Sequence, residues 1–399
     1  MSSPPSETAA AARTPAPRDS SDAAFHALTL WVASRAGIVI LAVVGTGALL
    51  GDRAAPSFVD RWRHWDADLL IKIAQYGYGG DPSAPPDAGL PAFFPGMPVM
   101  LRVVHLLVPD WTLSGLLISM VAGGVAVVAL ARLAEFEGPP GAGWRAVLAL
   151  LLCPTAVFLF AGYSEALFLA FAIPAWLAAR RGDWLTAGLL AAGASCMRIT
   201  GLFLALALIV EYAGGSWRAH RRREPYRTHW GWLAVPFVPL VLYSAYQHGR
   251  TGDWLAWNHA QEAGWGRTLV PPWESFLTTW QEATGNGPYV WAFRLEIAGA
   301  FVGVALVGWL LARRRWSELV YVGLQVGALV CSAYYLSIPR SALLWWPLWL
   351  ALARATTPRP GETSRRSRLR RSGIWVYALL IAPLMALNTL TFLAGAWAG

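Results

Sequence analysis

The segment WDADLLIKIAQYGY, which runs from Trp65 to Tyr78, carries a carboxylate in an unusual position. If the segment is helical, Asp66 projects into an apolar face made by Leu69, Leu70 and Ile73. A carboxylate on such a face is costly unless other groups satisfy it. Asp66 therefore either caps a helix that starts one residue later, or faces an enclosed site and acts as a general base. The two roles are compatible.

The opposite face of the same segment has a simpler interpretation. Asp68 and Lys72 lie four residues apart, the spacing that favours an ion pair along a solvated helix face. One charged face and one apolar face are typical of an amphipathic helix that lies at a membrane interface. The segment is thus predicted to be interfacial, with Asp66 as its chemically interesting residue.

Two arginines and one acidic turn are further candidates. Arg198 is a lone cation between two apolar runs, and an ionisable residue in such a place is a functional hypothesis by default. Its alternative role is a structural ion pair, for example with Glu165. The turn Tyr163-Ser164-Glu165 could equally serve the next helix, through a cap from Ser164 and a favourable dipole interaction of Glu165. Arg340 could bind an anionic group through its planar guanidinium.

The composition indicates a membrane protein. Of the 399 residues, 56% are hydrophobic and 14% are charged, and the mean hydropathy is +0.43. Soluble proteins carry about 25% charged residues. The net charge of +9 comes from arginines clustered between apolar segments. The positive-inside rule accounts for that pattern, so no nucleic-acid partner is expected.

The apolar segments predict an all-α polytopic membrane protein with about eleven membrane segments. These lie at 28–50, 112–133, 144–160, 164–179, 184–197, 199–212, 230–248, 294–312, 318–336, 341–354 and 373–396. Residues 1–27 are expected to be a disordered cytoplasmic tail, followed by a multi-spanning domain over 28–399.

The arginine-rich loops predict how the chain is oriented. The loops at 217–227, 313–315 and 359–371 should be cytoplasmic, which also places the N-terminus inside. The first outer loop, 51–110, then carries the amphipathic helix, and 249–293 forms a second large outer loop rich in Trp. Every candidate residue falls on the extracytoplasmic side.

In combination these residues resemble the PIG-V family of mannosyltransferases. The resemblance rests on Trp65-Asp66, Ile73-Ala74, Gly77-Tyr78, Phe93-Phe94-Pro95 with Pro98 and Arg102, Pro154 with Tyr163-Ser164-Glu165, Arg198 with Gly201, and Arg340 with Pro347. These motifs occur in the family's order across 28–350. The sequence departs from the family pattern at Leu69, Leu70, Met97 and Ser341, positions that bear on acceptor identity.

The resemblance implies a GT-C type fold and an active site on the outer side of a cell membrane. It implies inverting transfer of mannose, or a similar hexose, from a polyprenyl-phosphate donor to a hydroxyl of a lipid, glycan or protein. Asp66 would be the base, and Arg198 and Arg340 would bind the donor phosphate. Substrate contacts would come from Trp65, Tyr78, Phe94, Tyr163 and Glu165. No metal or other cofactor is expected.

Two other functions compete with transfer. A lipid-linked sugar transporter or flippase would need polar residues along a path through the spans, whereas the candidates here gather on one side. A non-catalytic partner of another membrane enzyme would tolerate the departures from the family pattern. Sugar transfer by the purified protein separates the enzyme from both alternatives.

Overall fold

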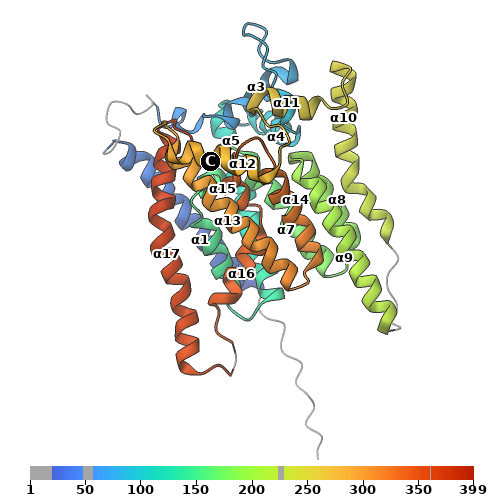
Figure 1. Ribbon diagram of the computed structural model, residues 1–399, viewed down its shortest axis with the longest axis vertical. Helices are drawn as coiled ribbons and strands as arrows, with labels where there is room; N and C mark the ends of the chain where they lie inside the picture. Colours follow the sequence, from blue (N-terminus) through green and yellow to red (C-terminus); the bar gives the residue numbers. More distant parts are fainter. Residues whose placement is uncertain (1–19, 48–56, 223–228, 360) are drawn as a thin grey trace, which may run out of the picture.

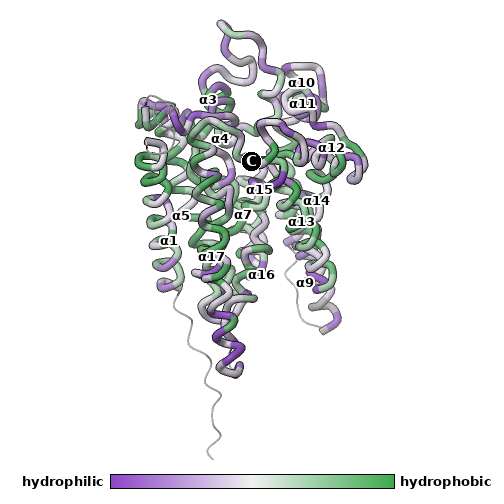
Figure 2. Tube along the Cα trace, turned by 60° about the vertical axis from the view of Figure 1, so that its left-hand side comes forward, coloured by the Kyte–Doolittle hydropathy of each residue, from purple (hydrophilic) through white to green (hydrophobic). Residues whose placement is uncertain are grey.

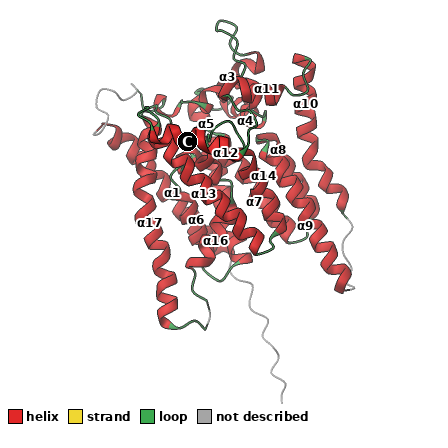
Figure 3. Ribbon diagram, in the orientation of Figure 1, coloured by secondary structure: helices red, strands yellow, loops and turns green. Residues whose placement is uncertain are grey.

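The computed structural model describes residues 20–47, 57–222, 229–359 and 361–399. In these ranges the regular secondary structure is helical, and the helices run roughly alongside one another (Figures 1 and 3). The chain is therefore all-α, as predicted. Hydrophobic residues dominate the middle of the molecule, and hydrophilic residues gather towards its two ends (Figure 2).

Within the described ranges, five helices are long and apolar enough to cross a membrane. They are α1 (Ser20–Ile40, continued by a π-helical turn at Leu41–Gly45), α5 (Trp111–Glu137), α9 (Thr200–Arg222), α13 (Val290–Ala312) and α17 (Ser364–Leu393). The chain is a multi-pass membrane protein on this evidence.

Shorter helices fill the bundle between the long ones. They are α6 (Ala142–Leu151), α7 (Ser164–Arg180), α8 (Trp184–Met197), α10 (Val238–Thr251), α14 (Trp316–Val330) and α16 (Trp346–Thr356). Several predicted spans are interrupted. The span at 144–160, for example, is α6 followed by a turn at Pro154, because proline cannot continue the hydrogen-bond ladder. The count of about eleven membrane segments stays a prediction.

Five helices lie towards one end of the bundle, the upper end in Figure 1. They are α3 (Asp66–Tyr76), α4 (Gly96–His105), α11 (Ala256–Trp265), α12 (Pro272–Thr284) and α15 (Ile338–Ala342). The predicted amphipathic helix is α3, which buries Ala67, Leu70, Ile71, Ile73 and Ala74. Tyr76, at the end of α3, is 48% exposed.

Two predictions about local structure are wrong. The first concerns the end of the disordered tail predicted for 1–27. Residues 1–19 lie outside the described residues, but α1 begins at Ser20, and Ala27 is fully buried. Asp22 stabilises that start because a carboxylate in the first turn interacts favourably with the helix dipole.

The second error is the pair Asp68–Lys72. Asp68 instead accepts from Arg63 at 2.7 Å, and Lys72 lies 3.2 Å from Asp87. Loop residues outside the helix offered both side chains nearer partners, which spacing along the helix alone does not reveal.

Glycines allow the helices near the site to approach one another closely. A Cβ built on Gly115 of α5 would lie 3.2 Å from the Cα of Gly162, which itself has a φ of +77°. Gly162 adopts this left-handed conformation without a side-chain clash. Small residues let backbones in membrane bundles come close, and this contact fixes the turn that leads into Tyr163.

Candidate functional site

Asp66 and Arg340 are 274 positions apart in sequence and form an ion pair in the structure. Arg340 Nη1 donates to Asp66 Oδ2 at 2.7 Å. The predicted capping role of Asp66 is wrong in its register, because α3 begins at Asp66 itself and Trp65 occupies the N-cap position. The carboxylate is instead held by a guanidinium, and only 15% of its side chain is exposed.

Glu165 extends this pair into a chain of alternating charges. Its Oε1 accepts from Arg198 Nη1 at 2.7 Å and lies 3.6 Å from Arg340 Nε. Glu165 is fully buried, and Arg198 also donates to Ser164 Oγ at 2.8 Å. The predicted pairing of Arg198 with Glu165 is thus confirmed. Glu165 also lies in the first turn of α7, as the helix-dipole alternative requires, whereas the N-cap position is held by Tyr163 and not by Ser164.

A strained segment holds Arg340 in place. Ser337, which precedes α15, has a φ of +63°, an uncommon conformation for a residue other than glycine. The buried Glu296 of α13 accepts from the backbone N–H groups of Ser337 and Ile338, each at 2.7 Å. Trp65, directly before Asp66, also has a positive φ, +52°. Such strain persists where surrounding contacts enforce it, and it is common at functional sites.

Two aromatic rings flank the Arg340 guanidinium. Its central carbon lies 5.4 Å from the ring of Phe158 and 5.5 Å from that of Tyr163, within cation–π range. The Tyr163 hydroxyl donates to the carbonyl of His64 at 3.0 Å, which ties down the segment before Asp66. Burial, reinforced by Asp66, raises the pKa of Tyr163 well above its ordinary value, so this hydroxyl remains a donor.

A break between two helices positions Arg198. Helix α8 ends at Met197, Arg198 is extended with φ −154° and ψ +154°, and α9 begins at Thr200. A Cβ built on Gly201 would lie 2.4 Å from the Cα of Ser195. Only glycine fits there, so the family-like Gly201 allows the tight junction that presents Arg198.

A third arginine, Arg267, was missed by the sequence reasoning. It lies between α11 and α12, and its Nη2 donates to the carbonyl of Leu336 at 3.0 Å. Burial, followed by repulsion from Arg340, lowers the pKa of Arg267 to about 10, while Asp66 opposes that shift. The signal in the sequence was one cation in the otherwise uncharged run GWGRTLVPPW.

Three buried polar atoms of the site have no hydrogen-bond partner within the described ranges. They are Glu165 Oε2, Arg340 Nε and Arg267 Nε. Buried polar atoms are normally satisfied, so such atoms are places where a ligand would bind. Three guanidinium groups lie here near three carboxylates, of which Asp66 and Glu165 pair with arginines and Glu296 accepts from backbone N–H groups. The Nε atoms of Arg340 and Arg267 remain donors without a hydrogen-bond partner among the described residues, which suits an anionic ligand.

Other predicted site residues lie apart from this chain of charges. Trp65 is 48% exposed, next to Asp66. The Tyr78 hydroxyl donates to the carbonyl of Phe93 at 2.8 Å, and Phe94 is buried against Tyr243, with ring centroids 4.6 Å apart. Phe94 therefore belongs to the neighbouring aromatic cluster.

The four departures from the family pattern differ in burial. Leu70 is 2% exposed and Met97 is fully buried. Leu69 and Ser341 are half-buried.

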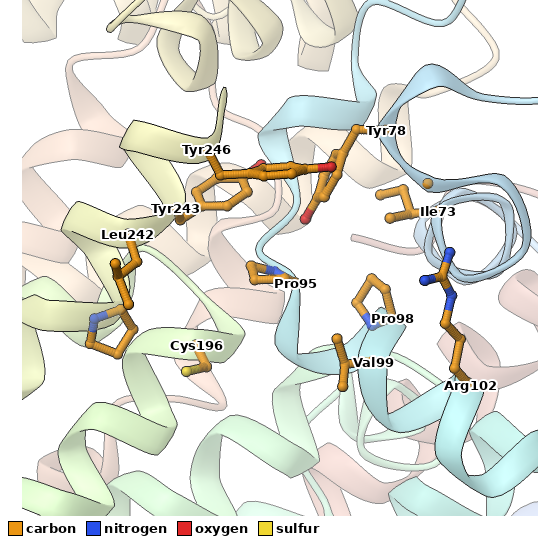
Figure 4. A pocket seen from close by; sticks show the side chains of 12 residues that line it. Ile73, Tyr78, Pro95, Pro98, Val99, Arg102, Cys196, Leu242, Tyr243 and Tyr246 are labelled. Carbon is orange, nitrogen blue, oxygen red and sulfur yellow. The ribbon is translucent and has the colours of Figure 1, made fainter. Parts of the chain in front are cut away.

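An apolar cavity of about 430 Å³ lies beside α8, which ends at Met197 (Figure 4). It is lined by Ile73, Gly77, Tyr78, Pro95, Pro98, Val99, Arg102, Cys196, Pro239, Leu242, Tyr243 and Tyr246. Figure 4 shows three tyrosine rings along one side of the cavity, with prolines and Cys196 below them. Cys196 is two residues from Arg198, so the cavity approaches the charged site from the side of α8.

The fold and the site define a class of protein: a multi-pass helical membrane protein with a buried Asp–Arg–Glu–Arg chain towards one end. Residues 45–248, just over half of the chain, match the family described as Mannosyltransferase (PIG-V), and the chain belongs to this family. The resemblance drawn from the motifs is confirmed. The match includes Asp66, Glu165 and Arg198, whereas Arg340 lies beyond it.

The similar curated proteins share one description. Human GPI alpha-1,6-mannosyltransferase 2 is 32% identical over 223 residues, which cover 49% of this chain and 44% of the human protein. The protein of the same name from Cricetulus griseus is 34% identical over 149 residues, 35% of this chain and 29% of that one. The chain thus matches less than half the length of these relatives.

A search of solved structures finds ArnT from Cupriavidus metallidurans, in a crystal structure with undecaprenyl phosphate bound. The TM-score is 0.49 at 16% identity, over 91% of this chain and 76% of that one.

Proposed function

We propose that this protein is a membrane mannosyltransferase that moves mannose, or a similar hexose, from a polyprenyl-phosphate donor to an acceptor hydroxyl. The observation that carries the proposal is the 2.7 Å pair of Asp66 and Arg340 within a chain that also includes Glu165 and Arg198. A carboxylate suits proton acceptance, and the guanidinium groups suit a phosphate. Membership of a mannosyltransferase family supports the choice of sugar.

The proposed reaction is a single displacement with inversion at the anomeric carbon. The acceptor oxygen bonds to that carbon while the bond from carbon to phosphate oxygen breaks, and the lipid phosphate leaves with the electron pair. Asp66 accepts the proton of the acceptor hydroxyl. Arg340, Arg198 and Arg267 stabilise the negative charge that grows on the leaving phosphate.

The ion pair between Asp66 and Arg340 also links donor binding to the availability of the base. In the free protein the Arg340 guanidinium is engaged by Asp66. A donor phosphate would compete for that guanidinium through charge-assisted hydrogen bonds. Donor binding would therefore release Asp66 for its role as base, so that the base becomes available only when the leaving group is bound.

The apolar cavity supports a lipid-linked donor. Its volume of about 430 Å³ and its proline and aliphatic lining suit a stretch of prenyl chain. Cys196 places one wall two residues from Arg198, so a chain in the cavity would carry its phosphate towards the guanidinium groups. The acceptor belongs to the same proposal and is a hydroxyl on a lipid, glycan or protein.

We assign the site to the extracytoplasmic side and the N-terminus to the cytoplasm. The arginine-rich segments at 313–315 and 359–371 flank the ends of α13 and α17 that lie opposite the α3 and α15 end (Figure 1). The positive-inside rule favours a cytoplasmic location for such segments. A membrane-borne donor fits an outer site, since nucleotide sugars are absent there.

The decisive experiment measures transfer of labelled mannose from polyprenyl-phosphate mannose in proteoliposomes, with an added panel of hydroxyl acceptors. We expect wild-type protein to transfer sugar, and Asp66→Asn to lose at least about 100-fold in rate, because its general base is gone. Asp68→Asn is the matched control, since Asp68 is exposed and pairs with Arg63. No transfer by wild type, or full activity of Asp66→Asn, would favour the transporter or the non-catalytic partner instead.

A further inference from the structure

A second and larger cavity lies between the ends of α13 and α16 that are remote from Asp66. Its volume is about 1780 Å³, and its lining includes eight arginines and four glutamates. The arginines are Arg180, Arg313, Arg314, Arg315, Arg354, Arg359, Arg366 and Arg370. Among these lining residues the charge balance is therefore strongly positive.

The floor of this cavity is a closed ion-pair network. Glu137, at the end of α5, is almost fully buried and lies 2.6 Å from both Arg315 and Arg354 and 3.3 Å from Arg180. Arg180 also pairs with Glu211, and Arg315 with Glu318. Three arginines thus meet three carboxylates, and the floor needs no ligand to balance its charge.

The rim of the cavity is different. Arg370 pairs with Glu362 at 2.9 Å. The side chains of Arg313, Arg314, Arg359 and Arg366 have no carboxylate partner within the part of the chain that the structure describes. Arg314 has a φ of +54°, so two adjacent arginines turn around the end of α13 in a strained backbone. These four cations account for the excess positive charge.

Two apolar walls lead from this rim towards the middle of the bundle. Residues spaced three or four apart lie on one face of a helix, and this spacing holds on both walls. The wall residues are Val302, Ala305, Leu306 and Trp309 on α13, and Leu348, Ala351, Leu352 and Ala355 on α16. In Figure 2 the middle of the bundle is mostly coloured hydrophobic, and its lower end is more hydrophilic.

We propose that this cavity binds the phosphate headgroup of an anionic lipid, with the hydrocarbon chains lying in the groove between α13 and α16. Guanidinium groups bind phosphate through paired, charge-assisted hydrogen bonds. The four unpaired rim arginines supply those donors, and the apolar walls are spaced to receive chains. A soluble phosphate compound would use the same arginines but would leave the walls uncovered.

The test measures thermal unfolding of the full chain in zwitterionic detergent with increasing phosphatidylglycerol, and with phosphatidylcholine as the neutral lipid. A ligand that binds the folded state raises the unfolding midpoint with its concentration. We expect phosphatidylglycerol to raise the midpoint and phosphatidylcholine to leave it unchanged. Inorganic phosphate and glycerol 3-phosphate form the soluble arm and should have no effect at equal concentration.

Matched variants connect the effect to the cavity. The double variant Arg313→Gln/Arg366→Gln should need about tenfold more phosphatidylglycerol for the same rise, since it loses two charge-assisted contacts. Arg365→Gln/Arg368→Gln removes two neighbouring exposed arginines of α17 that do not line the cavity, and should respond like wild type. Ala305→Trp, which fills the groove and keeps every charge, should also weaken the response.

Three outcomes would overturn the proposal. They are the absence of any midpoint rise with phosphatidylglycerol, an equal rise in the Arg313/Arg366 double variant, and an equal rise with the soluble phosphates. The last result would assign the site to a soluble anion. Because the readout is unfolding, the test is independent of the proposed transferase activity.

Discussion

At the scale of single residues, the site depends on one fully buried carboxylate. Glu165 lies between Arg198 and Arg340, and no solvent reaches it to screen their charges. A buried ion pair adds little net stability, but removing one partner leaves buried charge uncompensated. Glu165 therefore matters first for holding Arg198 and Arg340 close to each other.

The first residue-scale prediction concerns stability. Glu165→Ala should lower the free energy of unfolding by about 3–5 kcal/mol, because two arginines lose their shared counter-charge. Unfolding in mixed detergent micelles would measure the change. Glu262→Ala, at an exposed acidic side chain, should stay within about 0.5 kcal/mol of wild type. Equal stability of the two variants would contradict the central role of Glu165.

The second residue-scale prediction concerns the arginine that the sequence reasoning missed. Arg267→Gln should lower the transfer rate by about tenfold to 100-fold, because the departing phosphate loses one of three nearby cations. Steady-state transfer in proteoliposomes would measure it. Arg294→Gln removes an exposed arginine that donates only to the carbonyl of Ala283, and it should retain the wild-type rate. An unchanged rate in Arg267→Gln would remove Arg267 from the site.

At the scale of elements, breaks between helices position the charged groups of the candidate site. Arg198 lies between α8 and α9, Asp66 starts α3, and Arg340 belongs to the five-residue helix α15. Groups at helix ends can point into a common space, whereas groups along continuous spans would be distributed around the helices. Bonds from Glu296 to the backbone of Ser337 and Ile338 keep α15 fixed.

Gly201→Ala tests this arrangement. The added Cβ would lie 2.4 Å from the Cα of Ser195, so the junction must open and Arg198 must move. We expect transfer to fall by more than about tenfold, because small displacements of positioning groups are costly in rate. Gly308→Ala on α13 meets nothing within 4 Å and serves as control. Both variants should be compared by transfer rate and by unfolding midpoint.

At the scale of the whole molecule, the two charged sites lie at opposite ends of the bundle. The Asp66 site lies towards the end that carries α3, α11 and α15, whereas the large arginine-lined cavity lies at the other end of α13 and α16. This division fits both proposals above, in which the cytoplasmic end binds anionic headgroups and the outer end receives a lipid-linked sugar.

Cysteine labelling in intact cells tests that orientation. The three native cysteines are first replaced, and exposed positions are then changed singly, as Ser83→Cys near α3 and Ser364→Cys at the start of α17. A membrane-impermeant maleimide should label the cysteine at 83 directly and the cysteine at 364 only after permeabilisation. The reverse pattern would place the Asp66 site in the cytoplasm.

The sequence alone determined the helical class, the family and most of the charged residues of the site. Long apolar runs in a chain with few charges leave the helix as the favoured structure, and Asp66, Glu165, Arg198 and Arg340 were identifiable as charges out of place. Helix boundaries at Ser20, Leu151 and Asp66 differed from prediction, and the early end of α6 reflects the proline that follows at 154.

Only the tertiary structure decided which of these charges meet. Asp66 and Arg340 are 274 residues apart, and no periodicity links them. Arg267 lies near the site, although its spacing from the other charges in the sequence did not indicate this. Asp68 pairs with Arg63, and Lys72 pairs with Asp87, in place of the predicted Asp68–Lys72 pair. Partner choice depends on which side chains the packed backbone brings within a few ångströms, and that distance is a property of the fold.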